Sequence, residues 1–145
     1  MADIKVQKIY KSYDSKKVLE NISFDVKKGE IVSILGPSGC GKTTLLKCVL
    51  GLEIPDDGNI FIDSEKQLEW LKNKRIAYVP QKYANFNHLT VEQNILAALQ
   101  NSTQNKNQKI DQILKNVGLD KHKKMYPGWL SGGMQQRLAL ARALA

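Results

Sequence analysis

An apolar run, a glycine-rich loop and a helical pattern follow one another directly, and this segment constrains the fold more than any other. Residues 36–43 read Gly-Pro-Ser-Gly-Cys-Gly-Lys-Thr, which fits the pattern of Gly, four residues and Gly-Lys-Ser/Thr. The preceding run, 31–35, is almost continuously apolar, as in a strand covered on both faces within a parallel sheet. The helical spacing after the loop predicts a helix that ends at Gly51. Its apolar positions are Leu45, Leu46, Val49 and Leu50.

The composition of this loop suits a chain of phosphates. Glycines let the backbone bend around an anion, and the start of the helix adds about half a positive charge. Lys42 can reach the β- and γ-phosphate oxygens, and Thr43 offers a hydroxyl to Mg²⁺. We therefore expect ATP and Mg²⁺ as cofactors. Cys40 is either a reactive thiol beside this helix start or an inert small residue. The predicted binding residues are Gly36, Pro37, Ser38, Gly39, Cys40, Gly41, Lys42, Thr43 and Thr44.

The chain is rich in predicted strands up to about residue 82 and helical after it. Turns are predicted at 27–29 and 55–58. The predicted strands are 4–6, 22–24, 59–63 and 75–79, the first two antiparallel and the last stopped by Pro80.

Three helices are predicted in the second part. Thr90 caps the first, with Gln93 at its third position; its apolar stripe is Val91, Ile95, Leu96 and Leu99. After a polar spacer at 101–108, the second carries Ile110, Ile113, Leu114 and Val117 and ends at Gly118. The third follows 126–129 and begins near Ser131.

The segment 130–137, Leu-Ser-Gly-Gly-Met-Gln-Gln-Arg, places a hydroxyl and two glycines at the mouth of the third helix. The apolar positions of that helix are Leu138, Leu140, Ala141 and Leu144. The segment has two interpretations. It is a second phosphate cradle, or a serine cap followed by a flexible glycine pair.

Taken together, these motifs resemble the nucleotide-binding domain of ABC transporters. The order is a phosphate loop, a strand ending in Tyr-Val-Pro-Gln at 78–81, a helical insert and Leu-Ser-Gly-Gly. The resemblance runs from about residue 3 to residue 145 and implies an α/β P-loop NTPase of the ABC ATPase type, here incomplete. Residues 1–82 would be the nucleotide-binding core, with antiparallel strands and the phosphate loop. Residues 83–145 would be the helical subdomain with the signature motif.

The resemblance implies roles for residues outside the loop. Tyr13 would stack on adenine, with core packing as the alternative. Gln81, catalytic together with Lys42, would touch Mg²⁺ and the attacking water, and the loop 82–90 would sense a membrane partner. The signature residues Ser131, Gly132 and Gly133 would bind the γ-phosphate held by the other subunit of a head-to-tail homodimer.

The resemblance also implies partners and a location. A transmembrane permease subunit would hold the protein peripherally at the inner, cytoplasmic face of the cell membrane. The motif at 134–137 is similar to ATPases of bacterial importers of sulfonates, nitrate or related solutes, but the solute is not named by any residue. The net charge of +8 comes from scattered lysines, so we expect no nucleic-acid partner.

The family pattern continues, after the signature helix, with a strand ending in Asp, a catalytic Glu and a switch His. The sequence ends at Ala145, and 60–63 resembles a peripheral strand instead. We therefore expect these 145 residues alone to show no ATPase activity, and the strand 31–35 to lack neighbours. The alternatives are a non-catalytic nucleotide-binding fragment and a soluble ABC ATPase outside transport.

Overall fold

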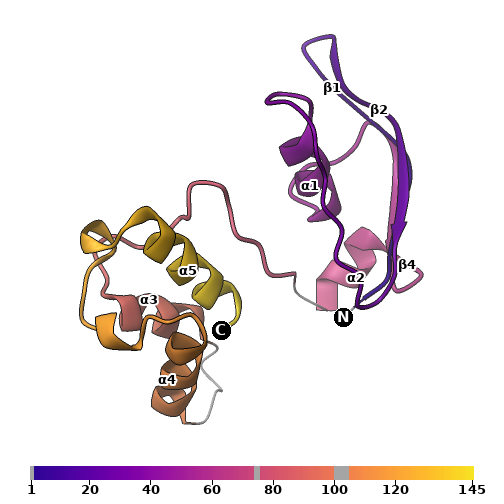
Figure 1. Ribbon diagram of the computed structural model, residues 1–145. Helices are drawn as coiled ribbons and strands as arrows, with labels where there is room; N and C mark the ends of the chain where they lie inside the picture. Colours follow the sequence, from indigo (N-terminus) through magenta and orange to yellow (C-terminus); the bar gives the residue numbers. More distant parts are fainter. Residues whose placement is uncertain (1, 74–75, 100–104) are drawn as a thin grey trace. The chain divides into compact units, whose positions relative to one another are not determined.

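The chain forms two compact units, Met1–Ile76 and Ala77–Ala145, called here the strand unit and the helical unit (Figure 1). The structure is a computed structural model that describes residues 2–73, 76–99 and 105–145. Its class is α/β, with an antiparallel sheet in the first unit and a helical second unit, as the sequence predicts.

An antiparallel sheet forms the strand unit, and its strand order is β2-β1-β3-β4. The predicted strands at 4–6 and 22–24 are confirmed, and each lies inside a longer strand. The predicted turn at 27–29 is also confirmed, at Lys28 and Gly29. The strands are β1 (Ile4–Tyr13), β2 (Lys16–Val26), β3 (Asp57–Ile62) and β4 (Glu65–Lys66).

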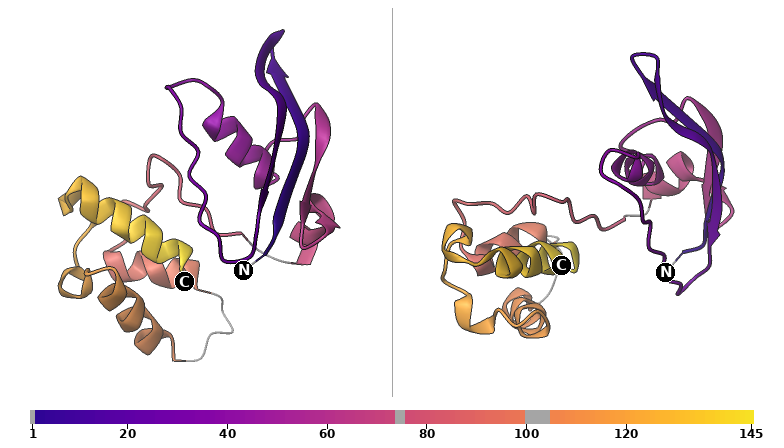
Figure 2. Two further views of the ribbon diagram at one scale, coloured as in Figure 1. Left: turned by 45° about the vertical axis from the view of Figure 1, so that its right-hand side comes forward. Right: turned by 45° about the horizontal axis from the view of Figure 1, so that its top comes forward.

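Helix α1 (Lys42–Val49) packs on one face of this sheet (Figures 1 and 2). It ends as the sequence predicts, because Gly51 is left-handed and its N–H donates to the Cys48 carbonyl at 3.1 Å. The Leu52 N–H donates to the Lys47 carbonyl at 3.0 Å, which completes the hydrogen-bond pair of this helix end. The core between helix and sheet contains Val6, Ile9, Leu19, Leu45, Cys48, Val49 and Ile60.

Helix α2 (Gln67–Asn73) is tied to the end of α1 by one buried side chain. The Gln67 amide nitrogen donates to the carbonyls of Cys48 and Val49 at 2.5 and 2.6 Å. These carbonyls lie in the last turn of α1; the Cys48 carbonyl also accepts the Gly51 N–H, and Gln67 adds a side-chain donor to both. The buried Gln67 side chain thus links the start of α2 to the end of α1.

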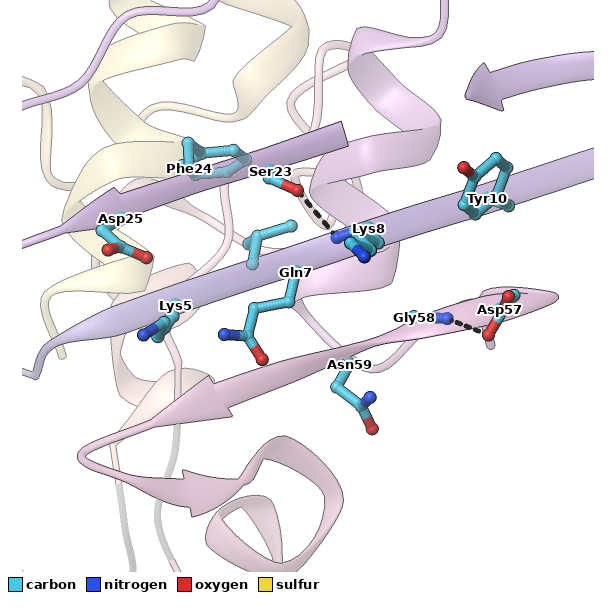
Figure 3. Close-up of a pocket in the computed structure, with 11 residues that line it drawn as sticks. Lys5, Gln7, Lys8, Tyr10, Ser23, Phe24, Asp25, Asp57, Gly58 and Asn59 are labelled. Atoms are coloured by element: carbon cyan, nitrogen blue, oxygen red, sulfur yellow. Dashed lines mark hydrogen bonds between the residues drawn. The ribbon is translucent and has the colours of Figure 1, made fainter. Parts of the chain in front are cut away.

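A bulge in β1 lets two residues three positions apart share the core. Val6 and Ile9 are both buried, although residues at that spacing in a regular strand point to opposite faces. Gln7 and Lys8 together oppose Ser23, whose hydroxyl accepts the Lys8 N–H at 2.8 Å (Figure 3). The extra residue therefore turns the side chains after it back toward α1.

Two predicted strands are wrong in the described structure. Residues 31–37 and 76–80 have no regular structure, and Arg75 lies outside the described residues. Ile31 and Leu35 are 96% and 90% exposed. A strand exists only through hydrogen bonds to a neighbour, and within residues 2–73, 76–99 and 105–145 no segment pairs with either run. The predicted strand 59–63 is confirmed with shifted bounds, as β3.

The described residues of the helical unit form three α-helices, and α3 packs against both α4 and α5 (Figure 2). The helices are α3 (Val91–Ala98), α4 (Lys106–Asn116) and α5 (Gly132–Ala143), with short 3-10 turns η1 (Asp120–His122) and η2 (Pro127–Trp129). The capping box is confirmed: the Thr90 hydroxyl accepts the Gln93 N–H, and the Gln93 side chain accepts the Thr90 N–H.

Most of the predicted apolar positions of the helical unit are buried in one core. The exceptions are Leu96, Leu140 and Leu144, which are exposed. The predicted spacer 101–108 ends too late, because α4 begins at Lys106; residues 101–104 lie outside the described residues. The core contains Val91, Ile95, Leu99, Ile110, Ile113, Leu114, Val117, Leu119, Leu130, Leu138 and Ala141.

The bulge yields the first prediction, at Gly58 of β3. This glycine has φ +95°, and a Cβ there would lie 2.2 Å from the Lys8 carbonyl oxygen. Gly58→Ala should therefore lower the free energy of unfolding of the strand unit by about 2 to 4 kcal/mol. Urea unfolding followed by Trp70 fluorescence in a Trp129→Phe background measures this unit. Gly128→Ala, where a Cβ meets nothing within 4 Å, is the control; equal stability of both variants would contradict the bulge.

Candidate functional site

The glycine-rich loop meets the sheet at the start of α1, where backbone lies against backbone. Gly41 is the residue before the helix and is left-handed, with φ +97°. A Cβ at Gly41 would lie 2.8 Å from the Val18 carbonyl oxygen and 3.0 Å from Leu19 Cδ2. Only glycine permits this approach, so Gly41 fixes where α1 starts relative to β2.

The Lys42 side chain bends into the loop. Its Nζ donates to the carbonyl oxygens of Gly36 and Pro37 at 2.8 and 2.7 Å and lies 3.6 Å from Cys40 Sγ. The loop is tight, since a Cβ at Gly36 would lie 2.7 Å from that sulfur. Residues 36–40 are nevertheless all exposed. The ammonium group therefore sits within an open loop of backbone.

The first turn of α1 is electrostatically open to an anion. Among the described residues, no side chain caps the helix, and α1 itself has no acidic residue in its first turn. Thr43 is exposed and Thr44 is half-buried in this turn. The first N–H groups of a helix lack helical acceptors and carry the positive end of its dipole. With Lys42 added, this is a concentration of positive charge suited to phosphate.

Magnesium fits the donors of this loop only as an ion shared with phosphates. The Thr43 hydroxyl is exposed and is the kind of oxygen ligand that Mg²⁺ accepts. Within the described residues there is no group of three or more His, Cys, Asp or Glu side chains that could hold a metal. A magnesium ion that takes most of its ligands from water and phosphate suits this donor set.

Tyr13 lies at the end of β1, and the core-packing alternative for it is wrong. Its side chain is 41% exposed. The Lys11 ammonium lies over the ring, 5.4 Å from its centroid. An exposed aromatic ring in the strand unit is available for stacking, and its role with adenine stays a prediction.

The signature segment caps α5 as predicted. The Ser131 hydroxyl accepts the Met134 N–H at 3.3 Å. Gly132 and Gly133 occupy the first turn, and a Cβ at either would meet nothing within 4 Å in the described structure. Neither has a positive φ. The cap accounts for the serine, whereas nothing in the described fold requires the two glycines.

Gln81 is exposed and lies in the helical unit, while the phosphate loop belongs to the strand unit. Their meeting at one magnesium ion stays a prediction.

Sequence reasoning missed how the loop after Gln81 is held. Asn94, fully buried in α3, accepts the Phe86 N–H at 2.9 Å and donates to the carbonyls of Phe86, Leu89 and Thr90 at 3.0 Å each.

Helix α5 holds the same loop from a second direction. The Arg142 guanidinium lies 4.2 Å from the centre of the Phe86 ring and donates to the Ala84 carbonyl. Burial lowers the pKa of Arg142. Asn85 donates to the Gln135 carbonyl at 2.9 Å. The loop 82–90 is thus connected to the helix that begins at the signature serine.

A hollow of about 760 Å³ lies on the sheet, where the bulge of β1 faces β2 and β3 (Figure 3). Its lining mixes polar and apolar groups and both signs of charge, with Lys5, Gln7, Asp25 and Asn59 among the polar side chains. None of the predicted nucleotide-binding residues lines it. This hollow is therefore separate from the nucleotide-binding residues predicted from the sequence.

None of the helices in the described ranges has the length and apolar character needed to cross a membrane.

Comparison with known proteins gives one family. The ABC transporter family matches residues 19–145. The spermidine/putrescine import ATP-binding protein of Thermotoga maritima is 42% identical over 147 residues, covering 99% of this chain and 40% of that protein. The Fe(3+) ions import ATP-binding protein of Fusobacterium nucleatum is 44% identical, covering 98% of this chain and 39% of that protein. The chain thus spans less than half the length of these relatives.

Solved structures agree with the sequence relatives. A dimeric structure of a post-hydrolysis state of an ATP-binding cassette, bound to ADP and Pi, is 31% identical with a TM-score of 0.84. The match covers 98% of this chain and 69% of that one. The structure of an ATP-binding subunit of an ABC transporter is 27% identical, with a TM-score of 0.80 and coverage of 96% and 60%.

The network around Asn94 yields the second prediction. Asn94→Ala would remove the acceptor of the Phe86 N–H and the side-chain donor to three carbonyls, of which those of Phe86 and Thr90 keep a backbone N–H, so the helical unit should lose about 2 to 4 kcal/mol of stability. Hydrogen exchange at the Phe86 amide should accelerate more than exchange within α4. Asn116→Ala changes an exposed asparagine and serves as the control. Unchanged exchange at Phe86 would show that the loop is held by other contacts.

Proposed function

Because this chain belongs to the ABC transporter family, we propose that it is the ATP-binding part of an energy-coupling subunit. ATP binding and hydrolysis by the whole protein would drive a solute across a membrane. The observation that carries the proposal is the open loop with the Lys42 ammonium inside it, set at the uncapped start of α1. Residues 1–82 would act as the nucleotide-binding core and 83–145 as the helical subdomain.

In this proposal the loop holds the triphosphate of ATP. Backbone N–H groups from Gly36 to Thr44 and the Lys42 ammonium bind the β- and γ-phosphates, and Tyr13 stacks on adenine. Lys42 already lies within the loop, so its ammonium moves only from carbonyl to phosphate oxygens. Thr43 and Gln81 would hold Mg²⁺, which, when bound, neutralises phosphate charge.

A second anion site at the signature segment supports a head-to-tail homodimer. Glycine is a poor helix former, costing about 0.5 to 1 kcal/mol relative to alanine in the middle of a helix, and the described fold gives no reason for two of them at the start of α5. Close approach of an outside ligand is such a reason. Ser131, Gly132 and Gly133 would bind the γ-phosphate of ATP that is held by the other copy of the chain.

The loop 82–90 is the proposed link to a transmembrane permease subunit. It follows Gln81 and is fixed to α3 by Asn94 and to α5 by Arg142. A displacement of this loop would therefore move both Gln81, which would contact Mg²⁺ and the attacking water, and α5, the helix that follows the signature serine. The protein would then lie at the cytoplasmic face of the membrane, bound through the permease. The relatives' names give different solutes, so the solute is left open.

A non-catalytic nucleotide-binding role is the second candidate for the 145 residues by themselves. Residues 31–37, which lead into the phosphate loop, and residues 76–80, which precede Gln81, form no sheet in the described structure. Placement of water and metal depends on such a framework, and loss of one stabilising group typically costs a factor of about 10² to 10³.

Binding of ATP with Mg²⁺ to the 145-residue chain tests the proposal. We expect binding by calorimetry, and Lys42→Ala should weaken it about 10- to 100-fold, since a charged hydrogen-bond donor is lost. Lys47→Ala is the matched control, because Lys47 is on the same helix and pairs with Glu53 at 3.7 Å. Equal affinity for ATP in both variants would contradict the proposal that the phosphate loop binds ATP.

Turnover gives a separate prediction. The same 145-residue chain should release no phosphate from ATP above background, because several catalytic groups of the family pattern have no counterpart in its sequence. A phosphate-release assay with the Lys42→Ala variant as the blank measures this. Steady turnover that disappears with Lys42→Ala would prove the expectation wrong and would favour catalysis over binding alone.

A further inference from the structure

Lys11 is a lysine held away from water beside the proposed base-binding tyrosine. Its side chain is only 15% exposed. The ammonium donates to the Ile54 carbonyl and to Asp56 Oδ1, both at 2.8 Å, and lies over the Tyr13 ring. Covering a lysine costs free energy unless its charge is met by partners. The partners here join the end of β1 to the segment after α1.

Asp56 holds the same end of β1 by its backbone. Its Oδ2 accepts the Ser12 N–H at 2.7 Å, and its own N–H donates to the Tyr10 carbonyl at 2.8 Å. The hydrogen bond to Asp56 raises the pKa of Lys11, and the hydrogen bond to Lys11 lowers the pKa of Asp56. Both groups are therefore charged at neutral pH. Ser12, which immediately precedes Tyr13, is therefore held by one carboxylate oxygen of Asp56, and Lys11 binds the other oxygen.

The pair also acts on the ring itself. Tyr13 lies at the tip of the β1-β2 hairpin, where it pairs with Lys16 and where an exposed side chain has several accessible rotamers. An ammonium within about 6 Å of an aromatic centroid attracts the ring. Lys11 therefore favours the orientation in which the ring lies under its ammonium. The rest of the ring remains exposed for a ligand.

We propose that Lys11 and Asp56 are positioning residues that hold Tyr13 for stacking on the base of a purine nucleotide. The inference rests on the proposed function, since it assumes that Tyr13 stacks on that base. The pair then determines how much affinity the base adds to that of the triphosphate. If the pair only tied the segment 54–56 to β1, its loss would weaken binding of the base and of the triphosphate alike, because α1 and its loop would shift together.

Competition binding with ATP and with inorganic triphosphate separates these roles. Lys11→Met should weaken ATP binding about three- to tenfold and leave triphosphate binding unchanged. Tyr13→Ala should show the same pattern, and the double variant should lose no more than Tyr13→Ala alone. Asp56→Asn should follow Lys11→Met, and Lys11→Arg should restore most of the affinity for ATP.

Lys17→Met is the matched control, because Lys17 lies in the neighbouring strand and pairs with Glu20 at the exposed surface. It should change neither ligand. Equal weakening of ATP and triphosphate by Lys11→Met, or no effect on either, overturns the inference while the proposed function stands. Unchanged ATP binding by Tyr13→Ala overturns it as well. If the wild-type chain binds neither ligand, the proposed function fails and the inference fails with it.

Discussion

The start of helix α1 packs against strand β2 at Gly41, which has no side chain, and the rest of the site depends on this contact. Gly41 lets the helix begin beside the Val18 carbonyl, and Leu45 and Cys48 then bury the helix on the sheet. The direction of α1 is thereby fixed at its first residue. The Lys42 ammonium bonds back to the Gly36 carbonyl and so closes the loop before the helix within seven residues. The loop therefore keeps its form although residues 31–35 are not part of a sheet.

The sequence predicted the helix ends and helix caps, because their hydrogen bonds lie within a few residues. The left-handed Gly51, the Thr90 and Gln93 pair and the Ser131 cap each depend on side chains or N–H groups no more than five positions apart. The run 31–35 failed for the opposite reason. Its apolar composition is suited to a buried strand, but pairing requires a partner far along the chain. An apolar composition indicates that a segment favours burial, but it does not show whether a strand is present to pair with it.

Other features had no local signal at all. Val6 and Ile9 are three positions apart and both buried, a spacing that contradicts strand periodicity until the bulge at Lys8 is known. Lys11 meets Asp56 from 45 positions away. Asn94 and Arg142 are polar residues in helical segments, and their function is set by a loop that comes before both helices. In each case, the tertiary contact decides the role.

The contacts of Lys42 within the loop bear on which ligands the proposed phosphate site would favour. Its ammonium is already bonded to two neutral carbonyl oxygens, so a ligand gains affinity only by offering better acceptors. Hydrogen bonds to charged acceptors are about twice as strong as those to neutral ones. A neutral ligand therefore gains little from replacing the carbonyls of Gly36 and Pro37. A triphosphate gains at the ammonium and again at the open N–H groups of α1, which lie at the same place. If the loop binds phosphate as proposed, we therefore expect it to favour ligands with several negative charges.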